Sequence, residues 1–492
     1  MMNQRKLNNL IVLHSLIFAI SFSICYVLYL FTGSNTSITR VILVLLALQI
    51  GVGFSLINRS VLTVLKIFFQ EKSSPYPLAI FRITFYSLLI GIYYHYQSQL
   101  AVLDLKNYSI AGNSGFDYLQ VFVYHPHLYY WIYWLGIITA FLCVIGYRFR
   151  YLSVANIFFS FIIIGSPMLI FKVSYSHIWF WGTIFLACSP ASDVLSVDSF
   201  SRKKTIISSA KYLIPLKFFW LQLGINYFFS AYNKLVLSGI AWSSPSNMVH
   251  QIHYEWLTGH YSLPIHLSTF SLALGFGGML ALLVEFCFIF WIFSTYTRWL
   301  ALFGGLSIHW FTTIFMNLTF WDLQLIYLSF LPILFVNPRT NKQTSFQSET
   351  YLNRFFHLSM MVLVINSLLG LFNITSWPFS QYPTHATLIP KYLNSIVLTG
   401  ISSTKDTLNL NEITQKNHFR VDDLGSRMEE AVLNLQNKDT AAYVRNVHLI
   451  WNQYQIGNPE LKLIPCPQVS LETVNMDNLS KKEIPIHINL CE

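Results

Sequence analysis

Four ionisable residues stand inside long apolar stretches of this chain. Lys234 ends the run FFWLQLGINYFFSAYNKLVL, Glu285 lies in LALLVEFCFIF, His309 in GGLSIHWF and His177 in SYSHIWFWG. A charged side chain costs about 2.5–3.5 kcal/mol at the centre of a bilayer, so such residues usually pair, line a cavity or carry out chemistry. Desolvation among aromatic side chains favours the neutral amine of a lysine, which can then act as a general base, and a nearby histidine could orient it or relay its proton.

The stretch that ends in Lys234 also carries a stripe of amides. At 100° per residue, Gln222, Asn226 and Asn233 share one helix face, and Lys234 borders that face. The stripe must look into a helix bundle, where it could line a site or only join helices through hydrogen bonds. Lys234 by itself could also be an interfacial lysine that extends its ammonium to water. The residues predicted to support a site around Lys234 and His177 are Glu285, His309, Asn226, Asn233 and Arg82, the last from LAIFRITF.

The composition is that of a membrane protein. Of the 492 residues, 54% are hydrophobic and only 11% are charged. The apolar runs are continuous and reach the roughly 20 residues that a spanning helix needs, which favours helices over a barrel. The predicted fold is an all-α polytopic membrane protein of about 9–11 transmembrane helices. The predicted spans are 10–31, 41–57, 78–96, 128–147, 151–171, 177–194, 213–235, 268–296, 299–316, 319–336 and 355–373.

The distribution of charge predicts the orientation. The net charge of +10 is dispersed over short loops and forms no basic patch, so no nucleic-acid partner is expected. Loops on one side of the predicted bundle hold most of the Lys and Arg, and the positive-inside rule places that side in the cytoplasm. We therefore expect a cytoplasmic N-terminus and an exoplasmic C-terminus in a bacterial cytoplasmic membrane, with Lys234 and His177 near the outer face.

The expected domains are an extension with two spans at 1–76, a core at 77–337, a linker with the last span at 338–373 and an exoplasmic α+β domain at 374–492. In the last domain, helical spacing between about 422 and 454 is followed by strand-like alternation after Leu461. Cys466 and Cys491 could form a disulfide there if the domain faces an oxidising compartment. No Cys/His spacing typical of a metal site occurs, and no metal is predicted.

Several of these segments together resemble a known family. SHIWFWGTIFLACSPASDVLSVDS, INYFFSAYNKL and VEFCFIFWIFSTYTRWLALFGGLSIHW, in this order and after LAIFRITFYSLL, are similar to the vitamin K-dependent γ-glutamyl carboxylases. They also resemble the horizontally transferred transmembrane (HTTM) domain that these enzymes share with bacterial proteins. The resemblance covers roughly residues 77–337.

The resemblance implies a role for each residue. Lys234 matches the catalytic base, His177 the histidine that assists it, Glu285 an intramembrane acid and His309 a later histidine. In that family the base deprotonates a vitamin K hydroquinone, which reacts with O₂ to give an alkoxide. The alkoxide removes a γ-proton from a glutamate side chain, and CO₂ adds to the carbanion. This chain differs in having Asn233 where the animal enzyme has a second lysine, and a much shorter region after the last span.

The leading hypothesis is therefore a quinol-dependent, carboxylase-like membrane enzyme that modifies a secreted peptide or protein. The implied cofactor is a reduced quinone, and the implied partners are membrane lipid and that substrate. The alternative is a non-catalytic HTTM protein acting in export, maturation or immunity of a secreted peptide. A transporter is a third interpretation, because Glu285 and His309 could relay protons, although the sequence shows no inverted repeat.

Overall fold

A computed structural model describes the parts of the chain on which the following paragraphs rest. They are residues 68–101, 119, 121–122, 125–167, 177–200, 208–259, 261–295, 297–332, 350–371, 388–389, 391–401, 407–409 and 468–486. The predicted spans 10–31 and 41–57, the helix expected between 422 and 454, and both Cys466 and Cys491 lie outside these residues.

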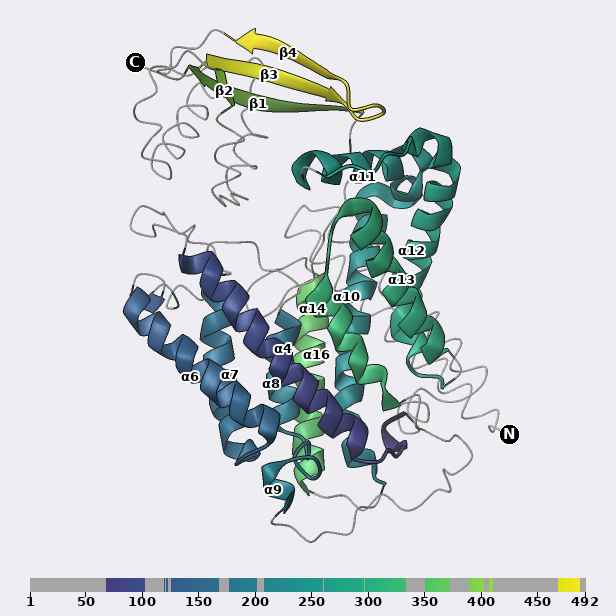
Figure 1. Ribbon diagram of the computed structural model, residues 1–492. Helices are drawn as coiled ribbons and strands as arrows, with labels where there is room; N and C mark the ends of the chain where they lie inside the picture. The colour runs from purple at the N-terminus through teal and green to yellow at the C-terminus, as the bar shows by residue number, and fades with distance from the viewer. Residues whose placement is uncertain are drawn as a thin grey trace, which may run out of the picture.

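The described residues form a helical bundle with a small sheet at one end (Figure 1). The long helices are α4 (Tyr76–Ala101), α6 (Pro126–Ile145), α7 (Phe149–Gly165), α8 (His177–Ala187), α10 (Ile214–Ser238), α11 (Pro245–Gly259), α12 (Ser271–Trp291), α13 (Arg298–Met316) and α16 (Thr350–Leu371). The short ones are α9 (Val197–Phe200), α14 (Trp321–Ile326), and the 3₁₀ turns η4 (Ala210–Tyr212), η5 (Gly239–Ser243), η6 (Leu267–Phe270) and η7 (Tyr327–Phe330).

Four segments in the described part are long and apolar enough to cross a membrane: Tyr76–Gln97, Pro126–Ile145, Leu267–Trp291 and Arg298–Met316. Phe149–Gly165, His177–Ala187 and His357–Leu371 are apolar but shorter. The structure thus agrees with a mostly helical, membrane-type chain, and the larger number of spans remains a prediction.

Helix α10 is absent from that set because it is surrounded by protein. It lies between α8, α12 and α16, and its buried residues include Gln222, Asn233 and Lys234 as well as apolar side chains. A helix that touches lipid on little of its surface does not need to be apolar all round. The polar residues that lower its hydropathy therefore point into the bundle, as the amide stripe predicts.

Three elements differ from the predicted spans. Helix α8 ends at Ala187, shortly before Pro190, so the span expected at 177–194 is a helix of 11 residues. The span expected at 319–336 is divided into α14 and the 3₁₀ turn η7. Helix α11 was not predicted, although Met248, Val249, Ile252 and Trp256 recur at helical spacing between polar residues.

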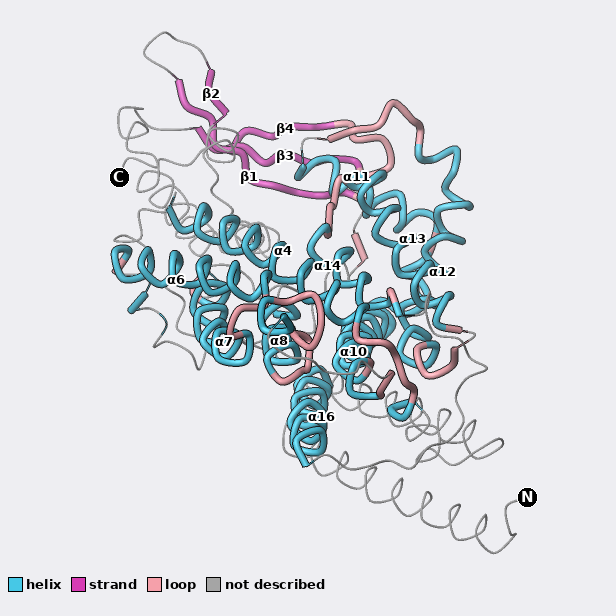
Figure 2. The backbone as a smooth tube through the Cα atoms, turned by 60° about the horizontal axis from the view of Figure 1, so that its bottom comes forward, coloured by secondary structure: helices cyan, strands magenta, loops and turns pink. Residues whose placement is uncertain are grey.

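The described residues of the C-terminal region form an antiparallel sheet of order β2-β1-β3-β4. Its strands are β1 (Tyr392–Ile401), β2 (Thr407–Asn409), β3 (Gln468–Asn475) and β4 (Lys481–Ile486), the last two in the region where alternation predicts strands. In two views the turn between β3 and β4 lies beside α11 (Figures 1 and 2).

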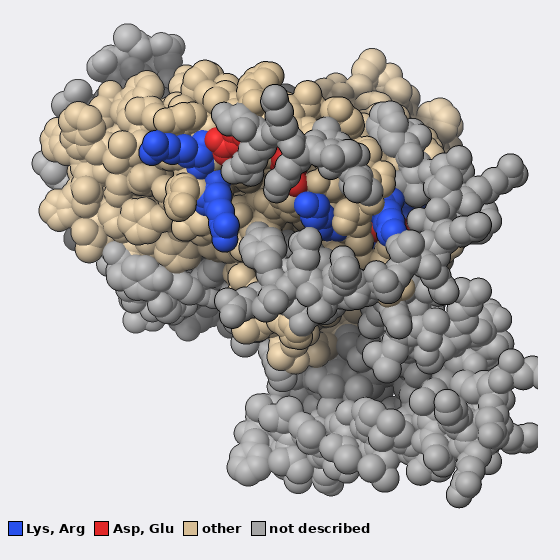
Figure 3. All heavy atoms as spheres, turned by 90° about the horizontal axis from the view of Figure 1, so that it is seen from below, with Lys and Arg blue, Asp and Glu red and all other residues tan. Residues whose placement is uncertain are grey.

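The end of the bundle farthest from the sheet collects the loops that the charge distribution assigns to one side. Ser73 and Ser209 form a backbone bridge there, and Lys211 pairs with Asp193 at 3.2 Å. The backbone amides of Arg148 and Phe149 donate to the carboxylate of Asp198. Charged side chains stand out on this face among uncharged ones (Figure 3). The orientation of the chain in a membrane remains a prediction.

Candidate functional site

Lys234 forms an ion pair with Glu285 between α10 and α12. Its Nζ lies 2.7 Å from Oε1 and 2.8 Å from Oε2 of Glu285, and both residues are nearly fully buried. The helices approach closely because Gly224 leaves room for Ile289, whose Cδ1 would be 2.6 Å from an added Cβ. Nζ also lies 4.4 Å from the ring centroid of Trp242, in a cation–π contact. Lys234 therefore neither points into lipid nor extends to water.

His309 belongs to a separate network of hydrogen bonds with Tyr227 and Tyr327. The hydroxyl of Tyr327 donates to that of Tyr227 at 2.6 Å, and the Tyr227 hydroxyl lies 2.5 Å from Nε2 of His309. Tyr227 thus accepts from Tyr327 and shares a second hydrogen bond with the imidazole ring of His309.

Close packing of helix α13 against Tyr327 holds this hydrogen-bonded network together. A Cβ added to Gly305 would lie 1.8 Å from the hydroxyl oxygen of Tyr327, so only glycine admits that hydroxyl here. On α10, Tyr227 precedes Lys234 by seven residues and shares its face. Its ring stacks on Phe288, three residues after Glu285, with centroids 4.8 Å apart. One face of α10 thus presents both the ion pair and the tyrosine chain to α12 and α13.

His177 does not lie beside Lys234 as expected. Its Nε2 is 3.2 Å from Nε2 of Gln222, whose amide donates to the ring. Lys234 follows Gln222 by twelve residues, which is about 18 Å along the helix axis. Direct assistance from His177 to Lys234 is incompatible with this separation.

The amide stripe divides into one partnered and two unpartnered members. Gln222 meets His177, but within the described part of the chain neither amide atom of Asn226 or Asn233 has a hydrogen-bond partner, and all four atoms are buried. Nδ1 of His309 is likewise buried without a partner there. A buried polar group without a partner is costly, and a bound ligand or water can relieve that cost.

Arg82 stands at the other end of the bundle from Lys234. Its guanidinium donates to the carbonyl oxygens of Ala191 at 3.1 Å, Val144 at 3.2 Å and Leu195. It is fully buried and joins the end of α6 to the loop after α8. Arg82 therefore holds two connections in place and does not support the Lys234 site.

A second buried cluster was not anticipated from the sequence. Lys217, near the start of α10, lies 3.0 Å from Oε2 of Glu71, and Nη1 of Arg298 lies 2.9 Å from the same oxygen. Lys217 also donates to the carbonyl of Phe68. The sequence offered one signal for this cluster: Glu71 is an acid close to a predicted span and is therefore a candidate partner for a buried cation. The segment 68–75 is therefore attached to α10 and α13 by charge.

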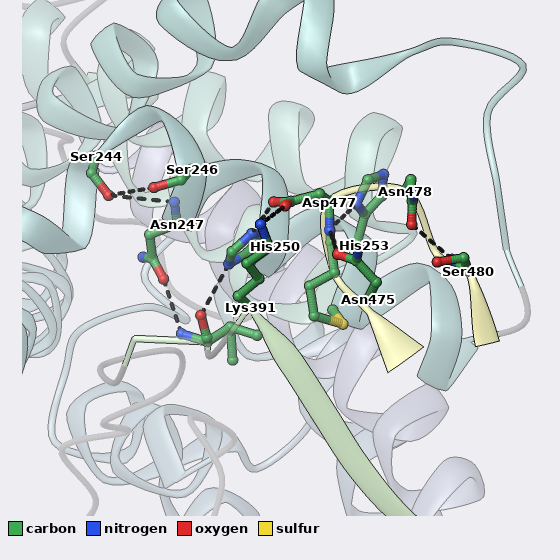
Figure 4. A network of polar contacts seen from close by, with 12 residues as sticks. Ser244, Ser246, Asn247, His250, His253, Lys391, Asn475, Asp477, Asn478 and Ser480 are labelled. Atoms are coloured by element: carbon green, nitrogen blue, oxygen red, sulfur yellow. Dashed lines mark hydrogen bonds and ion pairs between the residues drawn. The ribbon is translucent and has the colours of Figure 1, made fainter. Parts of the chain in front are cut away.

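Trp242, which covers the ammonium of Lys234, is held by α11. Nδ2 of Asn247 donates to the carbonyl of Trp242 at 2.6 Å, and Oδ1 of Asn247 accepts from the backbone amide of Ile389 at 3.0 Å. The side chain of Asn247, labelled in Figure 4, thus connects the segment leading into the sheet to Trp242, the residue beside Lys234. The helical spacing of apolar residues in α11 is the feature of the sequence that could have predicted a helix here.

Among the described residues no group of three His, Cys, Asp or Glu side chains is placed to hold a metal ion. No disulfide joins Cys143, Cys188 and Cys287, the cysteines in the part of the chain that the structure describes. No protein-family model, no curated protein and no solved structure matches this chain.

Proposed function

We propose that this protein is a membrane-embedded acid–base enzyme of the carboxylase-like HTTM class, with the Lys234–Glu285 pair at its centre. It acts with a lipid-soluble quinol on a secreted peptide or protein. The observation that carries this proposal is an enclosed lysine–carboxylate pair beside buried amides without protein partners. The resemblance in residues 77–337 supplies the reaction class.

The implied cofactor is a reduced quinone, and the polar groups present fit it. A quinol offers hydroxyl oxygens that donate and accept hydrogen bonds. The amides of Asn226 and Asn233, which have no hydrogen-bond partner among the described residues, supply both kinds of partner, and Nδ1 of His309 is a further buried nitrogen. When bound, the quinol supplies reducing equivalents and, with O₂, the strong base of the carboxylase reaction.

The ion pair changes how Lys234 can act as a general base. An ammonium held by two carboxylate oxygens cannot accept a proton, so Lys234 acts as a base only after its proton has moved. Glu285 is the acceptor within reach, at 2.7 Å, and the transfer leaves a neutral amine beside a neutral acid. Glu285 is thus the partner of the base, and His177 is too distant for that role.

The test is quinol-dependent incorporation of labelled CO₂ into glutamate-containing peptides, together with mass spectrometry of co-purified lipid. Lys234→Ala is expected to lower the rate by about 10²–10⁴-fold, the usual contribution of a positioned acid–base group. Lys234→Arg should fail too, because guanidinium stays protonated. The exposed Lys482→Ala is the matched control and should keep the wild-type rate. Full activity of Lys234→Arg would mean that the site needs only positive charge.

The second candidate is a non-catalytic HTTM protein in export, maturation or immunity of a secreted peptide. The observation that favours it is the completeness of the ion pair, since a lysine with both carboxylate oxygens in contact is also what a purely structural pair requires. A gene for a small secreted peptide next to this one, with no quinone in the purified protein, would select this candidate.

The proposed orientation places the sheet and α11 outside the cytoplasm and the charged face of Figure 3 inside. It rests on the excess of Lys and Arg in the loops at that face. Cysteine introduced at the exposed Lys482 should react with an impermeant reagent in intact cells. Reaction only after lysis would reverse the orientation and remove the access of a secreted substrate.

A further inference from the structure

Helix α11 presents His250 and His253 to the turn between β3 and β4 and to the segment before β1 (Figure 4). Nδ1 of His250 lies 3.1 Å from the carbonyl oxygen of Ile389, and its Nε2 lies 2.8 Å from Oδ1 of Asp477. Nδ1 of His253 lies 2.6 Å from the carbonyl oxygen of Met476. These contacts join the sheet to the helical bundle.

The two histidines differ in what their partners demand. A carbonyl and a carboxylate oxygen only accept hydrogen bonds, so both ring nitrogens of His250 must donate. A neutral imidazole has one N–H, and its second nitrogen would then set a lone pair against an oxygen. The contacts of His250 are complete only in the imidazolium form. His253 needs one N–H for Met476, which the neutral ring provides, and burial lowers the pKa of His253 and keeps it neutral.

The carboxylate in this network stays ionised. Hydrogen bonds from His250 and Lys391 lower the pKa of Asp477, and Nζ of Lys391 lies 3.0 Å from its Oδ2. Besides these groups and His253, α11 carries Tyr254 and Glu255 on its next turn.

Helices α12 and α13 pack against α11. Gly275 of α12 lies against Pro245, Gly278 lies against Met248, and Trp256 donates to the carbonyl of Phe315 on α13. The ionisable groups in the described contacts between α11 and the sheet are His250, His253, Asp477 and Lys391.

We propose that α11 is a proton-dependent docking surface for the C-terminal sheet, closed by the imidazolium of His250. The two contacts together need one proton more than a neutral ring carries, so docking is linked to proton binding and weakens as the pH rises. At still lower pH, protonation of Asp477 removes the partner. One proton linked to docking changes the equilibrium by up to about tenfold per pH unit.

Docking reaches the ion pair through Asn247. The amide of this residue binds Ile389 on the sheet side and the carbonyl of Trp242 on the other, and Trp242 covers the ammonium of Lys234. Undocking removes one of the two contacts that orient Asn247. This regulatory consequence rests on the proposed function, whereas the proton-dependent docking does not.

The experiment measures docking directly in the full-length protein in lipid nanodiscs. Spin labels are placed on cysteines at the exposed positions Thr269 and Lys482, in a chain whose native cysteines are replaced. Pulsed-EPR distance distributions are recorded from pH 5.5 to 8.5. We expect one narrow population at pH 5.5 and a growing broad population toward pH 8.5. Identical distributions across this range would overturn the proposal.

Three variants identify the group responsible. His250→Gln should lose the narrow population at pH 5.5 and the pH response with it, because glutamine has one donor nitrogen and one acceptor oxygen where the imidazolium has two donor nitrogens. Asp477→Asn should dock at pH 5.5 and at pH 8.5, because its amide can donate to a neutral ring. His253→Gln is the matched control on the same helix, and it should keep the wild-type pH response.

A pH response that persists in His250→Gln, or one that disappears in His253→Gln, contradicts the assignment to His250. The measurement uses neither quinol nor peptide, so its failure leaves the Lys234 test standing. Failure of the Lys234 test leaves the docking result standing in the same way.

Discussion

Helix α10 buries a lysine near each end, and the two lysines differ in the residues that they contact. Lys217 shares the carboxylate of Glu71 with Arg298 and also donates to the carbonyl of Phe68. Lys234 has Glu285 to itself and lies beneath the ring of Trp242. The first cluster therefore has two cations for one acid, whereas the second is a neutral pair.

The surroundings of the two lysines separate structure from chemistry. The donors and acceptors around Lys217 connect a loop segment to the bundle, which is a structural task. Beside Lys234, the amide of Asn233 is fully buried and has no partner among the described residues. A buried lysine thus does not by itself indicate a site. Polar atoms that the protein leaves unpaired next to it are the more informative sign.

The largest effect is expected from Glu71→Gln. It leaves Lys217 and Arg298 buried without their shared carboxylate, and an arginine cannot become neutral by losing a proton. Breaking such a cluster costs about 3–5 kcal/mol of unfolding free energy. Equilibrium unfolding in mixed detergent–SDS micelles measures the loss. Asp193→Asn, which breaks the half-exposed pair with Lys211 on the same face, is the control and should cost less than about 1 kcal/mol.

The same cluster should make stability depend on acid. Burial raises the pKa of the Glu71 carboxyl, but Lys217 and Arg298 lower it by more, so its folded pKa lies below the ordinary value. A depressed pKa stabilises the fold above the unfolded-state value, and this stability is lost as the pH falls through the folded pKa. Glu71→Gln should remove that part of the acid dependence. An unchanged acid profile would show that the cluster does not carry it.

A smaller effect is expected from Lys234→Met, about 2 kcal/mol, because this change leaves one buried charged group without its partner, whereas Glu71→Gln leaves two. The double variant Lys234→Met/Glu285→Leu should return to within about 1 kcal/mol of the wild type, since apolar residues often replace a buried pair at little cost. The same unfolding measurement completes the double-mutant cycle. A double variant as unstable as Glu71→Gln would give both ends of α10 the same structural role.

Part of this arrangement could be predicted from individual segments of the sequence. Apolar length predicted α4, α6, α10, α12 and α13 to within about five residues at each end, whereas α7 and α8 end earlier than expected and α11 was not predicted. The 100° spacing placed Gln222, Asn226 and Asn233 on one face of α10. Glu285 was expected to have a cationic partner or a proton, because an ionised carboxylate is costly in the middle of a span. The partner itself could not be predicted, since Lys234, His177 and Arg82 were all available within the apolar segments.

The sequence by itself determined that the chain is mostly helical with apolar, membrane-type helices, and which amides of α10 share a face, because hydropathy and helix periodicity act locally along the chain. Only the tertiary structure decided that Lys234 meets Glu285, that His177 meets Gln222 about 18 Å away, and that Arg82 serves the opposite end. It also decided that His250 on an unpredicted helix meets Asp477 of the distant sheet. Those pairings depend on which helices are neighbours and at what depth, and that follows from packing between segments far apart in the chain.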